Sequence, residues 1–271
     1  MRVSLSSPLT VKVRALPGWL RYALISASII VAWQLYVSLS GVNPLLVASP
    51  VAAAQALITD IGNGQLPSAA LVSLQNLVIG MALGIVLGLA LASLSTYSRF
   101  GRDLLTVLTA VLGPLPGIAI LPLLMLWFGL SPTAIIVVVV QSALWPIAGN
   151  TDTGFRTIGA TTRMVALNLG LSRSRTVLDV FLPAALPHIL SGLRLSWAFG
   201  WRTVVGAEVV FGVAGSAGGL GWYINNARYF LNSPAIFAGL VIISLLGILL
   251  DVIFLWIERK TVVKWGMKQF Q

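Results

Sequence analysis

The segment TRMVALNLGLSRSRTVLDVFLPAALPHILSGLRL, residues 162–195, decides the fold of this chain. It lies between two long apolar runs and contains several charged residues, among them Arg163, Arg173, Arg175 and Asp179. Because charged side chains are costly in hydrocarbon, this segment cannot lie in lipid. It divides into two helix-sized pieces, with breaks at Gly170 and at Leu182-Pro183. We interpret it as a structured loop on one face of a membrane, available to another protein.

The composition around this loop is that of a membrane protein. Of the 271 residues, 58% are hydrophobic and 9% are charged, and the mean hydropathy is +0.96. A soluble domain carries about 25% charged residues. In lipid, only helices and closed barrels satisfy the backbone polar groups. The apolar runs are about 20 residues long and do not alternate strictly, which favours helices over barrel strands. We predict an all-α, polytopic membrane protein.

Six membrane spans are predicted, together with one short amphipathic helix over about 50–62. The spans cover about 19–39, 69–94, 104–128, 132–150, 186–211 and 234–257. Proline at the start of the short helix and glycine after its end follow the usual asymmetry of helix termini. The third span is broken by Gly113–Gly117 and by Pro122, and the fourth has Pro146 near its end. The second span carries Gly80, Gly84 and Gly88, a spacing that lets helices approach closely in lipid.

The distribution of positive charge predicts the orientation. The chain has 17 basic and 7 acidic residues, a net charge of +10. With the N-terminus inside, the basic residues gather in the cytoplasmic segments, except that Arg228 lies outside and Arg194 and Arg202 lie within the fifth span. Cytoplasmic loops are enriched in lysine and arginine. We therefore expect six spans with both termini in the cytoplasm: an N-terminal tail over 1–18, a transmembrane domain over 19–258 and a C-terminal tail over 259–271.

Several classes of function are excluded by what the sequence lacks. It has no cysteine and one histidine, which argues against disulfides and against most metal sites. It has no GxxxxGK[ST] motif, so the chain does not bind ATP as a P-loop protein does. A nucleic-acid surface would need a basic stripe with interleaved aromatic residues, and none is present. We expect no cofactor in this chain and no nucleic-acid partner.

The loop residues resemble a known family. Ala166, Gly170, Leu182 and Pro183 match the EAA loop of ABC importer permeases. The Glu-Ala-Ala of that loop is replaced by Met164-Val165-Ala166, a departure common in the nitrate, sulfonate and taurine branch. Other stretches resemble the same branch, namely PLPGIAILPLLMLWFGL (114–130), WAFGWRTVVGAEVVFG (197–212) and GGLGWYINNARYFLNSPAIFAGLVIISLLGILLD (218–251). The resemblance covers about 45–265.

This resemblance implies a type I ABC importer permease fold in a bacterial inner membrane. It implies a coupling loop over about 160–186 that docks on a cytoplasmic ATPase, whose two copies bind the ATP and Mg. A second permease copy, as a homodimer, and an extracytoplasmic solute-binding protein are the other expected partners; the segment from Gly212 to Pro234 is expected to touch the binding protein. The candidate coupling residues are Ala166, Leu169, Gly170, Leu171, Ser172, Arg173, Leu182 and Pro183.

Local chemistry gives these loop residues roles of their own. Gly170 permits a tight bend where we expect a side chain to clash. Pro183 lacks a backbone donor and restricts Leu182, so we expect the helix to stop or kink there. The leucines offer apolar surface to a partner, and Arg173 and Arg175 are placed to pair with acids of the ATPase.

Ionisable residues within the spans are candidates for function. Arg202 carries a guanidinium suited to carboxylate, sulfonate or nitrate; the alternative is that Arg202 and Glu208 pair with other helices. Asp251 is expected to pair with a neighbour, Arg194 to extend to the interface, and the single His188 to be a packed residue. The third and fifth spans line the path in the family. The candidate path residues are Pro116, Trp197, Trp201, Arg202 and Glu208.

The predicted function is the transmembrane permease subunit of an ATP-driven importer for a small solute, expected to be a sulfonate, taurine, nitrate or similar anion. The same machinery could instead import a vitamin precursor or another neutral or cationic nutrient. A membrane-embedded enzyme would need paired acids, a nucleophile with its base or metal ligands, and the scattered acids do not supply them. A carrier or channel that works without ATP would not need the coupling loop.

Overall fold

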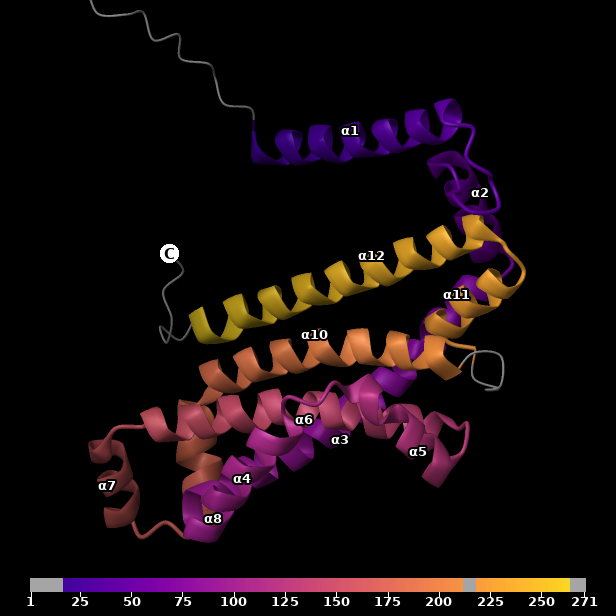
Figure 1. Ribbon diagram of the computed structural model, residues 1–271. Coiled ribbons are helices and arrows are strands. Elements are labelled where there is room, and N and C mark those ends of the chain that lie inside the picture. The colour runs from indigo at the N-terminus through magenta and orange to yellow at the C-terminus, as the bar shows by residue number, and fades with distance from the viewer. Residues whose placement is uncertain (1–16, 212–217, 264–271) are drawn as a thin grey trace, which may run out of the picture.

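The chain is helical throughout the part that the structure describes (Figure 1). The computed structural model describes residues 17–211 and 218–263, with the backbone alone for Arg163, Leu167, Arg173, Val262 and Val263. These ranges contain no strand, so the predicted all-α class is confirmed. The long helices are α1 (Gly18–Leu39), α3 (Gln65–Tyr97), α6 (Pro132–Thr157), α10 (Leu186–Phe211) and α12 (Ser233–Glu258).

The shorter elements lie between these helices. They are α2 (Pro50–Gly62), α4 (Arg99–Leu112), the 3₁₀ turn η1 (Gly117–Ile120), α5 (Leu121–Phe128), α7 (Ala160–Asn168), α8 (Arg173–Arg175), the π-helical η2 (Thr176–Phe181), α9 (Leu182–Ala184), α11 (Leu220–Tyr229) and the π-helical η4 (Arg259–Val263). The amphipathic helix predicted over 50–62 is confirmed as α2, which Ser49 caps by accepting a hydrogen bond from Ala52 N.

Four helices of the described chain are long and apolar enough to cross a membrane, and the number rises to six if each of two bent pairs counts as one span. The four are α1, α3, α6 and the stretch Ser233–Thr261. One bent pair joins Arg99–Leu112 to Gly117–Phe128 at 85°, so the break predicted in the third span is confirmed. The other pair joins Thr176–Ala184 to α10 at 73°. Six spans therefore require both bent pairs to be single spans.

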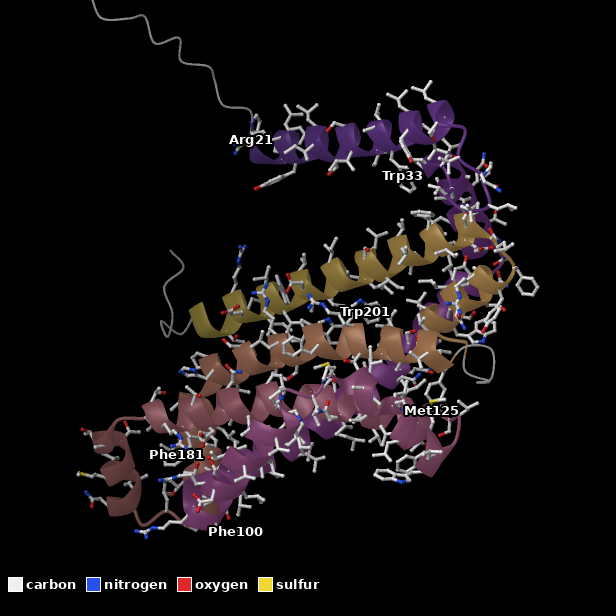
Figure 2. The ribbon with its side chains drawn as sticks, in the orientation of Figure 1. Arg21, Trp33, Phe100, Met125, Phe181 and Trp201 are labelled. Carbon is white, nitrogen blue, oxygen red and sulfur yellow. The ribbon has the colours of Figure 1, made fainter. Side chains whose placement is uncertain are left out.

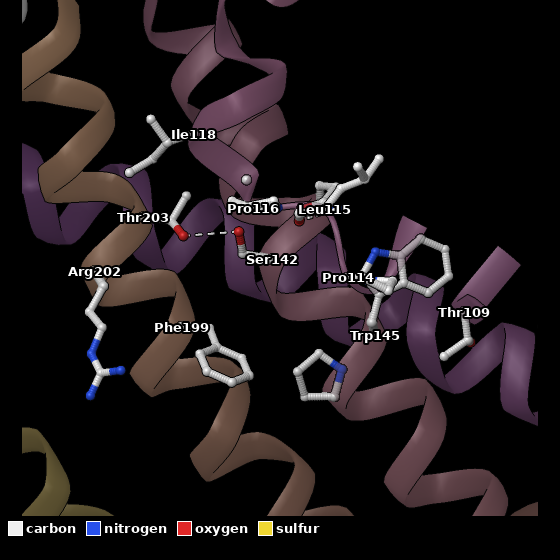
Figure 3. Close-up of a pocket in the computed structure, with 14 residues that line it drawn as sticks. Thr109, Pro114, Leu115, Pro116, Ile118, Ser142, Trp145, Phe199, Arg202 and Thr203 are labelled. Carbon is white, nitrogen blue, oxygen red and sulfur yellow. Dashed lines mark hydrogen bonds between the residues drawn. The ribbon is translucent and has the colours of Figure 1, made fainter. Parts of the chain in front are cut away.

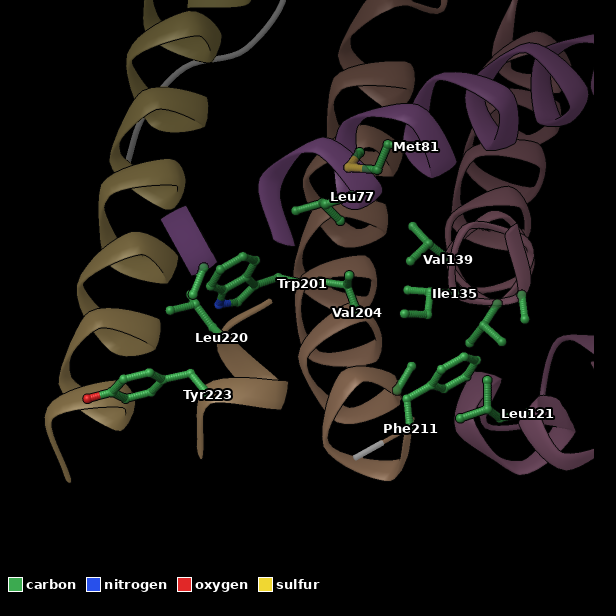
Figure 4. Packing of buried hydrophobic residues seen from close by; sticks show 14 of the residues in the cluster. Leu77, Met81, Leu121, Ile135, Val139, Trp201, Val204, Phe211, Leu220 and Tyr223 are labelled. Carbon is green, nitrogen blue, oxygen red and sulfur yellow. The ribbon is translucent and has the colours of Figure 1, made fainter. Parts of the chain in front are cut away.

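The centre of the bundle is the contact between α3 and α6, with α10 against both. A Cβ built on Gly80, Gly84 or Gly88 would lie 2.6–2.9 Å from side chains of α6, namely those of Val139, Ala143 and Ile147. The predicted close approach at this glycine row is therefore confirmed. On the other side of α6, the Ser196 hydroxyl of α10 donates to Ala143 O at 2.6 Å. The core around this contact contains Leu77, Met81, Val139, Trp201 and Val204 (Figure 4).

Helix α6 continues to Thr157, beyond the predicted end near residue 150. Pro146 lies inside this helix and removes one backbone donor. The Pro146 carbonyl accepts a hydrogen bond from Asn150 Nδ2 at 2.8 Å. The helix is also held between α3 and α10 on either side of the proline. The prediction was wrong by two turns because packing from two neighbours outweighs the local cost of the proline.

Helix α1 stands apart from the bundle and has no buried residue (Figures 1 and 2). The ring of Trp33 contacts that of Phe237 of α12, with ring centroids 4.9 Å apart. Its large apolar side chains are exposed on every side, as lipid-facing side chains are.

The start of α1 and the end of α12 lie on the side of the molecule where α7 lies, and α2 and α11 lie at the opposite end (Figure 1). This arrangement agrees with the predicted even number of crossings. That the α7 side is cytoplasmic stays a prediction, as do the roles of the tails, of which residues 1–16 and 264–271 lie outside the described residues.

Candidate functional site

The first candidate site is the coupling segment, residues 160–186, which projects from one end of the bundle as α7 followed by the bent run α8–η2–α9 (Figure 1). Helix α7 ends at Asn168, and the chain reverses at Gly170, whose φ is +65°. Leu171 N then donates to Ala166 O at 3.3 Å. A Cβ on Gly170 would meet nothing within 4 Å, so the expected clash was wrong. The position requires glycine because of its left-handed backbone instead.

Ser172 starts the second half of the coupling segment. Its hydroxyl accepts a hydrogen bond from Arg175 N at 3.4 Å, and its carbonyl accepts from Thr176 N at 2.8 Å and from the Thr176 hydroxyl at 3.0 Å. This is the arrangement of a serine at a helix N-cap. Arg175 is exposed, whereas the Arg173 side chain lies outside the described residues.

The helix does not stop or kink at Leu182, as the sequence led us to expect. Leu182 keeps helical angles (φ −62°, ψ −48°), and the chain turns at Ala185 (φ −87°, ψ 1°). The preceding turn is π-helical, and Leu182 N donates to Val177 O, five residues back. Where a π-helical turn returns to α-helix, one carbonyl loses its usual donor. A proline at 183 fits that point because it has no donor to offer.

The coupling segment is fastened on one side and open on the other. Val177, Phe181 and Ala185 are buried in a cluster with Phe155 of α6 and Ala92 of α3. The Phe155 and Phe181 rings lie 5.8 Å apart between centroids. On the open side, the segment exposes an apolar surface made of Met164, Val165, Leu169 and Leu178. We call these four residues the apolar coupling surface. Large apolar side chains left exposed on a protruding segment favour contact with another protein there.

Replacing Gly170 is expected to weaken the docking of the ATPase by about five- to thirtyfold, because a left-handed backbone costs a residue with a Cβ roughly 1–2 kcal/mol. Gly159 is the matched control. A Cβ on it also meets nothing within 4 Å, and its φ is not positive. We expect Gly170→Ala to lower the amount of ATPase that co-purifies with the permease, and Gly159→Ala to leave it unchanged. Equal losses in both variants would contradict this prediction.

The second candidate site is a pocket of about 540 Å³ between the break of the α4–α5 pair, α6 and α10 (Figure 3). Its wall at the break is Pro114–Ile118. Gln141 Nε2 holds this break open by donating to Leu112 O at 2.9 Å. A Cβ on Gly117 would lie 2.3 Å from Ser142 Oγ and 3.1 Å from Thr203 Cγ2, so the break approaches α6 and α10 closely. Pro116, a predicted path residue, lines this pocket.

Arg202 is the only cationic residue among those lining the pocket, and its side chain is exposed. It lies at the pocket's edge, with Phe199 between it and Trp145 (Figure 3). Within the described ranges, no carboxylate is in ion-pair distance of it. A charged side chain on a spanning helix faces a cavity or a partner rather than lipid. Its guanidinium therefore has donors available for an anion.

The polar groups of the pocket wall were missed in the sequence. The Ser142 and Thr203 hydroxyls are hydrogen-bonded at 2.9 Å. Trp145 Nε1, Gln141 Oε1 and Thr109 Oγ1 are buried and have no hydrogen-bond partner among the residues described. Buried polar groups without a partner are costly, and here they come from both α4 and α6. Gln141 and Ser142 within an otherwise apolar span were the available signal.

The other candidate path residues lie outside this pocket. Trp197 and Trp201 face α12: the Trp197 ring lies 5.7 Å from that of Phe254, and Trp201 Nε1 donates to Ile243 O at 3.2 Å. The two tryptophans therefore pack between α10 and α12. Glu208 is 1% exposed and bonds to α3 and α11 instead of to Arg202. The structure thus brings together only Pro116 and Arg202 of the five.

The remaining ionisable residues have structural partners. Arg194 of α10 forms a two-point ion pair with Asp251 of α12, with Nε–Oδ1 at 2.9 Å and the second nitrogen to Oδ2 at 3.1 Å. The expected pairing of Asp251 is therefore confirmed. His188 packs against α6, since a Cβ on Gly154 would lie 2.9 Å from His188 Cβ.

The sequence of this chain matches a known protein family. The model of the binding-protein-dependent transport system inner membrane component matches residues 84–263. The chain belongs to this family. It is an ABC importer permease of the branch that its loop resembles, and an integral membrane protein. The matched residues include the whole coupling segment, all of α10 and every residue that lines the pocket.

Individual relatives agree over nearly the full chain. The putative aliphatic sulfonates transport permease protein of Bacillus subtilis is 33% identical over 92% of this chain and 88% of its own length. The taurine transport system permease protein of Escherichia coli is 27% identical over 86% of each chain. The nitrate import permease protein of Synechocystis is 30% identical over 91% of this chain and 90% of its own length.

Proposed function

We propose that this permease forms the path of an ATP-driven importer for a small anion, and that the pocket beside Arg202 is part of this path. The observation that carries the proposal is an arginine without an ion-pair partner, among the residues described, at the edge of a pocket. The pocket lies beside the middle of α6 and so near the centre of the bilayer. An arginine at that depth is costly and needs a function or a partner to compensate for it.

The choice of an anion follows from the donors. The Arg202 guanidinium is an exposed donor, and its planar fork matches two oxygens of a sulfonate, nitrate or carboxylate. The three relatives named above are described as permeases for aliphatic sulfonates, taurine and nitrate. All three solutes carry an anionic oxygen group. A sulfonate, taurine or nitrate is accordingly the proposed solute class.

The proposed partners follow from the surfaces. An ATPase subunit, with its ATP and Mg, docks at the apolar coupling surface, whose four exposed side chains no described part of the chain covers. Two permease copies pair as a homodimer with two ATPases. A binding protein delivers the solute at the α2–α11 end, opposite α7 (Figure 1). The bent joint at Ala185 connects the docked segment directly to α10 and to Arg202.

The test is solute-stimulated ATP hydrolysis by the permease in nanodiscs, co-expressed with the ATPase and binding protein encoded beside it. Taurine, an alkyl sulfonate and nitrate are compared with a cationic thiamine precursor. We expect one of the anions to stimulate hydrolysis and the cation to have no effect. Stimulation by the cation alone would overturn the anion proposal. Failure of any ATPase to co-purify would overturn the importer proposal and favour a carrier or channel.

A further inference from the structure

A buried carboxyl group joins three helices at the end of the molecule opposite the coupling segment. Glu208 lies in the last turn of α10 and is 1% exposed. Its Oε2 accepts a hydrogen bond from the Ser73 hydroxyl of α3 at 2.6 Å and from Gly221 N of α11 at 3.1 Å. Within the described ranges, no basic side chain forms an ion pair with it. The group is therefore held by hydrogen bonds rather than by an opposite charge.

The N-terminus of α11 is capped by side chains of two other helices, α3 and α10. The first two backbone N–H groups of α11 belong to Leu220 and Gly221 and have no acceptor within the helix. Leu220 N donates to Ser73 Oγ at 2.8 Å, and Gly221 N donates to Glu208 Oε2. The residue at the N-cap itself is Gly219, which has no side chain to act as a cap. Glu208 and Ser73 therefore supply the acceptors that an N-cap side chain would otherwise provide.

The close contact between α10 and the start of α11 leaves no room for a side chain at Gly219 or Gly221. A Cβ on Gly219 would lie 2.2–2.3 Å from the carboxyl atoms of Glu208. A Cβ on Gly221 would lie 2.2 Å from Val205 O and 2.7 Å from Glu208 Cβ. The backbone of α11 can thus approach α10 only where side chains are absent.

Helix α11 also contacts α2, α10 and α12 through other residues. Leu220 is fully buried beside Trp201 in the cluster between α10 and α12 (Figure 4). The Tyr223 hydroxyl donates to Asp60 of α2. Burial, and then the adjacent Asp60 carboxylate, raise the pKa of the Tyr223 phenol, so it remains a neutral donor at physiological pH. Helix α11 in turn packs along α12.

We propose that Glu208 and Ser73 form a latch that makes α11 move together with α10. Helix α10 begins at the bent joint of the coupling segment, passes Arg202 at the pocket and ends at the latch. A displacement of α10 by the docked ATPase would therefore reach the opposite surface of the permease through Glu208. Glu208 is thus a positioning residue and makes no contact with the solute. The mechanical consequence rests on the proposed function, whereas the latch itself does not.

The latch is tested by the distance between α11 and α3. The chain has no cysteine, so spin labels can be attached at Leu71→Cys on α3 and Tyr229→Cys on α11, both exposed positions. The distance between the two spin labels is measured by pulsed electron–electron double resonance on the permease in nanodiscs. Glu208→Leu removes the acceptor at similar volume. Because a buried donor left without its acceptor costs about 1–3 kcal/mol, we expect the equilibrium to shift towards undocked α11 by roughly five- to hundredfold, with a broader distance distribution.

Two variants separate the latch from other roles. Glu208→Gln keeps an acceptor oxygen and is expected to retain the narrow distribution, whereas Thr151→Val changes a buried hydroxyl of α6 away from the junction and should also have no effect. If Glu208→Leu does not yield folded protein, Ser73→Ala removes the other half of the cap and should broaden the distribution in its place. A narrow distribution in Glu208→Leu or in Ser73→Ala would overturn the proposal. So would a distribution in Glu208→Gln as broad as in Glu208→Leu, since the charge would then be what matters.

A second readout tests the coupling. In the complete complex, we expect Glu208→Leu to lose solute-stimulated ATP hydrolysis while Glu208→Gln retains it. Altered distances with unaltered stimulation would overturn the coupling role. Unaltered distances would overturn the latch, whatever the solute or the ATPase does.

Discussion

Arg202→Gln is expected to lower the rate of anion uptake by roughly ten- to hundredfold, the equivalent of one lost hydrogen-bonded charge at about 1.5–3 kcal/mol. Among the residues that the structure describes, Arg202 is the only cation lining the pocket, and no carboxylate neutralises it. Glutamine keeps a polar side chain of similar reach but removes the charge and the planar fork. Uptake of the solute identified in the ATPase assay is the measurement.

Two further substitutions show whether the effect belongs to this position. Arg202→Lys keeps the charge without the fork and is expected to fall between wild type and Arg202→Gln. Arg99→Gln removes an exposed positive charge at the opposite end of α4 from Thr109 and outside the pocket lining, and should leave uptake unchanged. Normal uptake by Arg202→Gln would show that the anion does not pass this guanidinium.

Gly80→Leu is expected to prevent the permease from accumulating in the membrane. A Cβ at this position already falls 2.6 Å from Val139 Cβ and Cγ1 and 3.1 Å from Ile136 O. Val139 is fully buried, so neither it nor the α6 backbone can give way to a whole leucine without separating α3 from α6. Overpacking a tight core typically costs about 1–3 kcal/mol even for smaller changes. The measurement is the yield of monodisperse protein after extraction in mild detergent.

An alanine pair sharpens this test. Gly80→Ala is expected to lower thermal stability, because the added methyl group meets Val139. Gly149→Ala on α6 adds the same methyl group where nothing lies within 4 Å, and should raise stability by up to about 1 kcal/mol through helix propensity. If the two variants shifted the melting temperature equally, close approach at Gly80 would not be what the glycine provides.

Much of the coupling segment could be predicted because its signals are local. A positive-φ turn needs glycine whatever surrounds it, and Gly170 marked the reversal correctly, although the reason is backbone conformation and not a clash. Pro183 marked a break but placed it three residues early. The π-helical turn before it absorbs the missing donor, and no property of a single residue reveals a π-helical turn.

The residues that line the path were harder to predict, because the side chains of a helix point in all directions around its axis. Trp197, Trp201, Arg202 and Glu208 lie within three turns of α10, and their residue types alone suggested one shared role. In the structure these residues have different neighbours: the tryptophans contact α12, Arg202 lines the pocket, and Glu208 is hydrogen-bonded to α3 and α11. Which face meets which neighbour depends on helices that are distant in the sequence.

The sequence by itself determined that this protein is a helical membrane protein with a protruding loop, because hydropathy and turn residues act over a few neighbouring positions, and the resemblance of that loop to a known family indicated a permease. Only the tertiary structure decided that the break at Pro114–Gly117 packs closely against Ser142 and Thr203 beside a pocket, and that Glu208 caps a helix together with Ser73, 135 residues away in the chain. Hydrogen bonds and cavities of this kind exist only where separate helices meet, so packing had to be known before they could be seen.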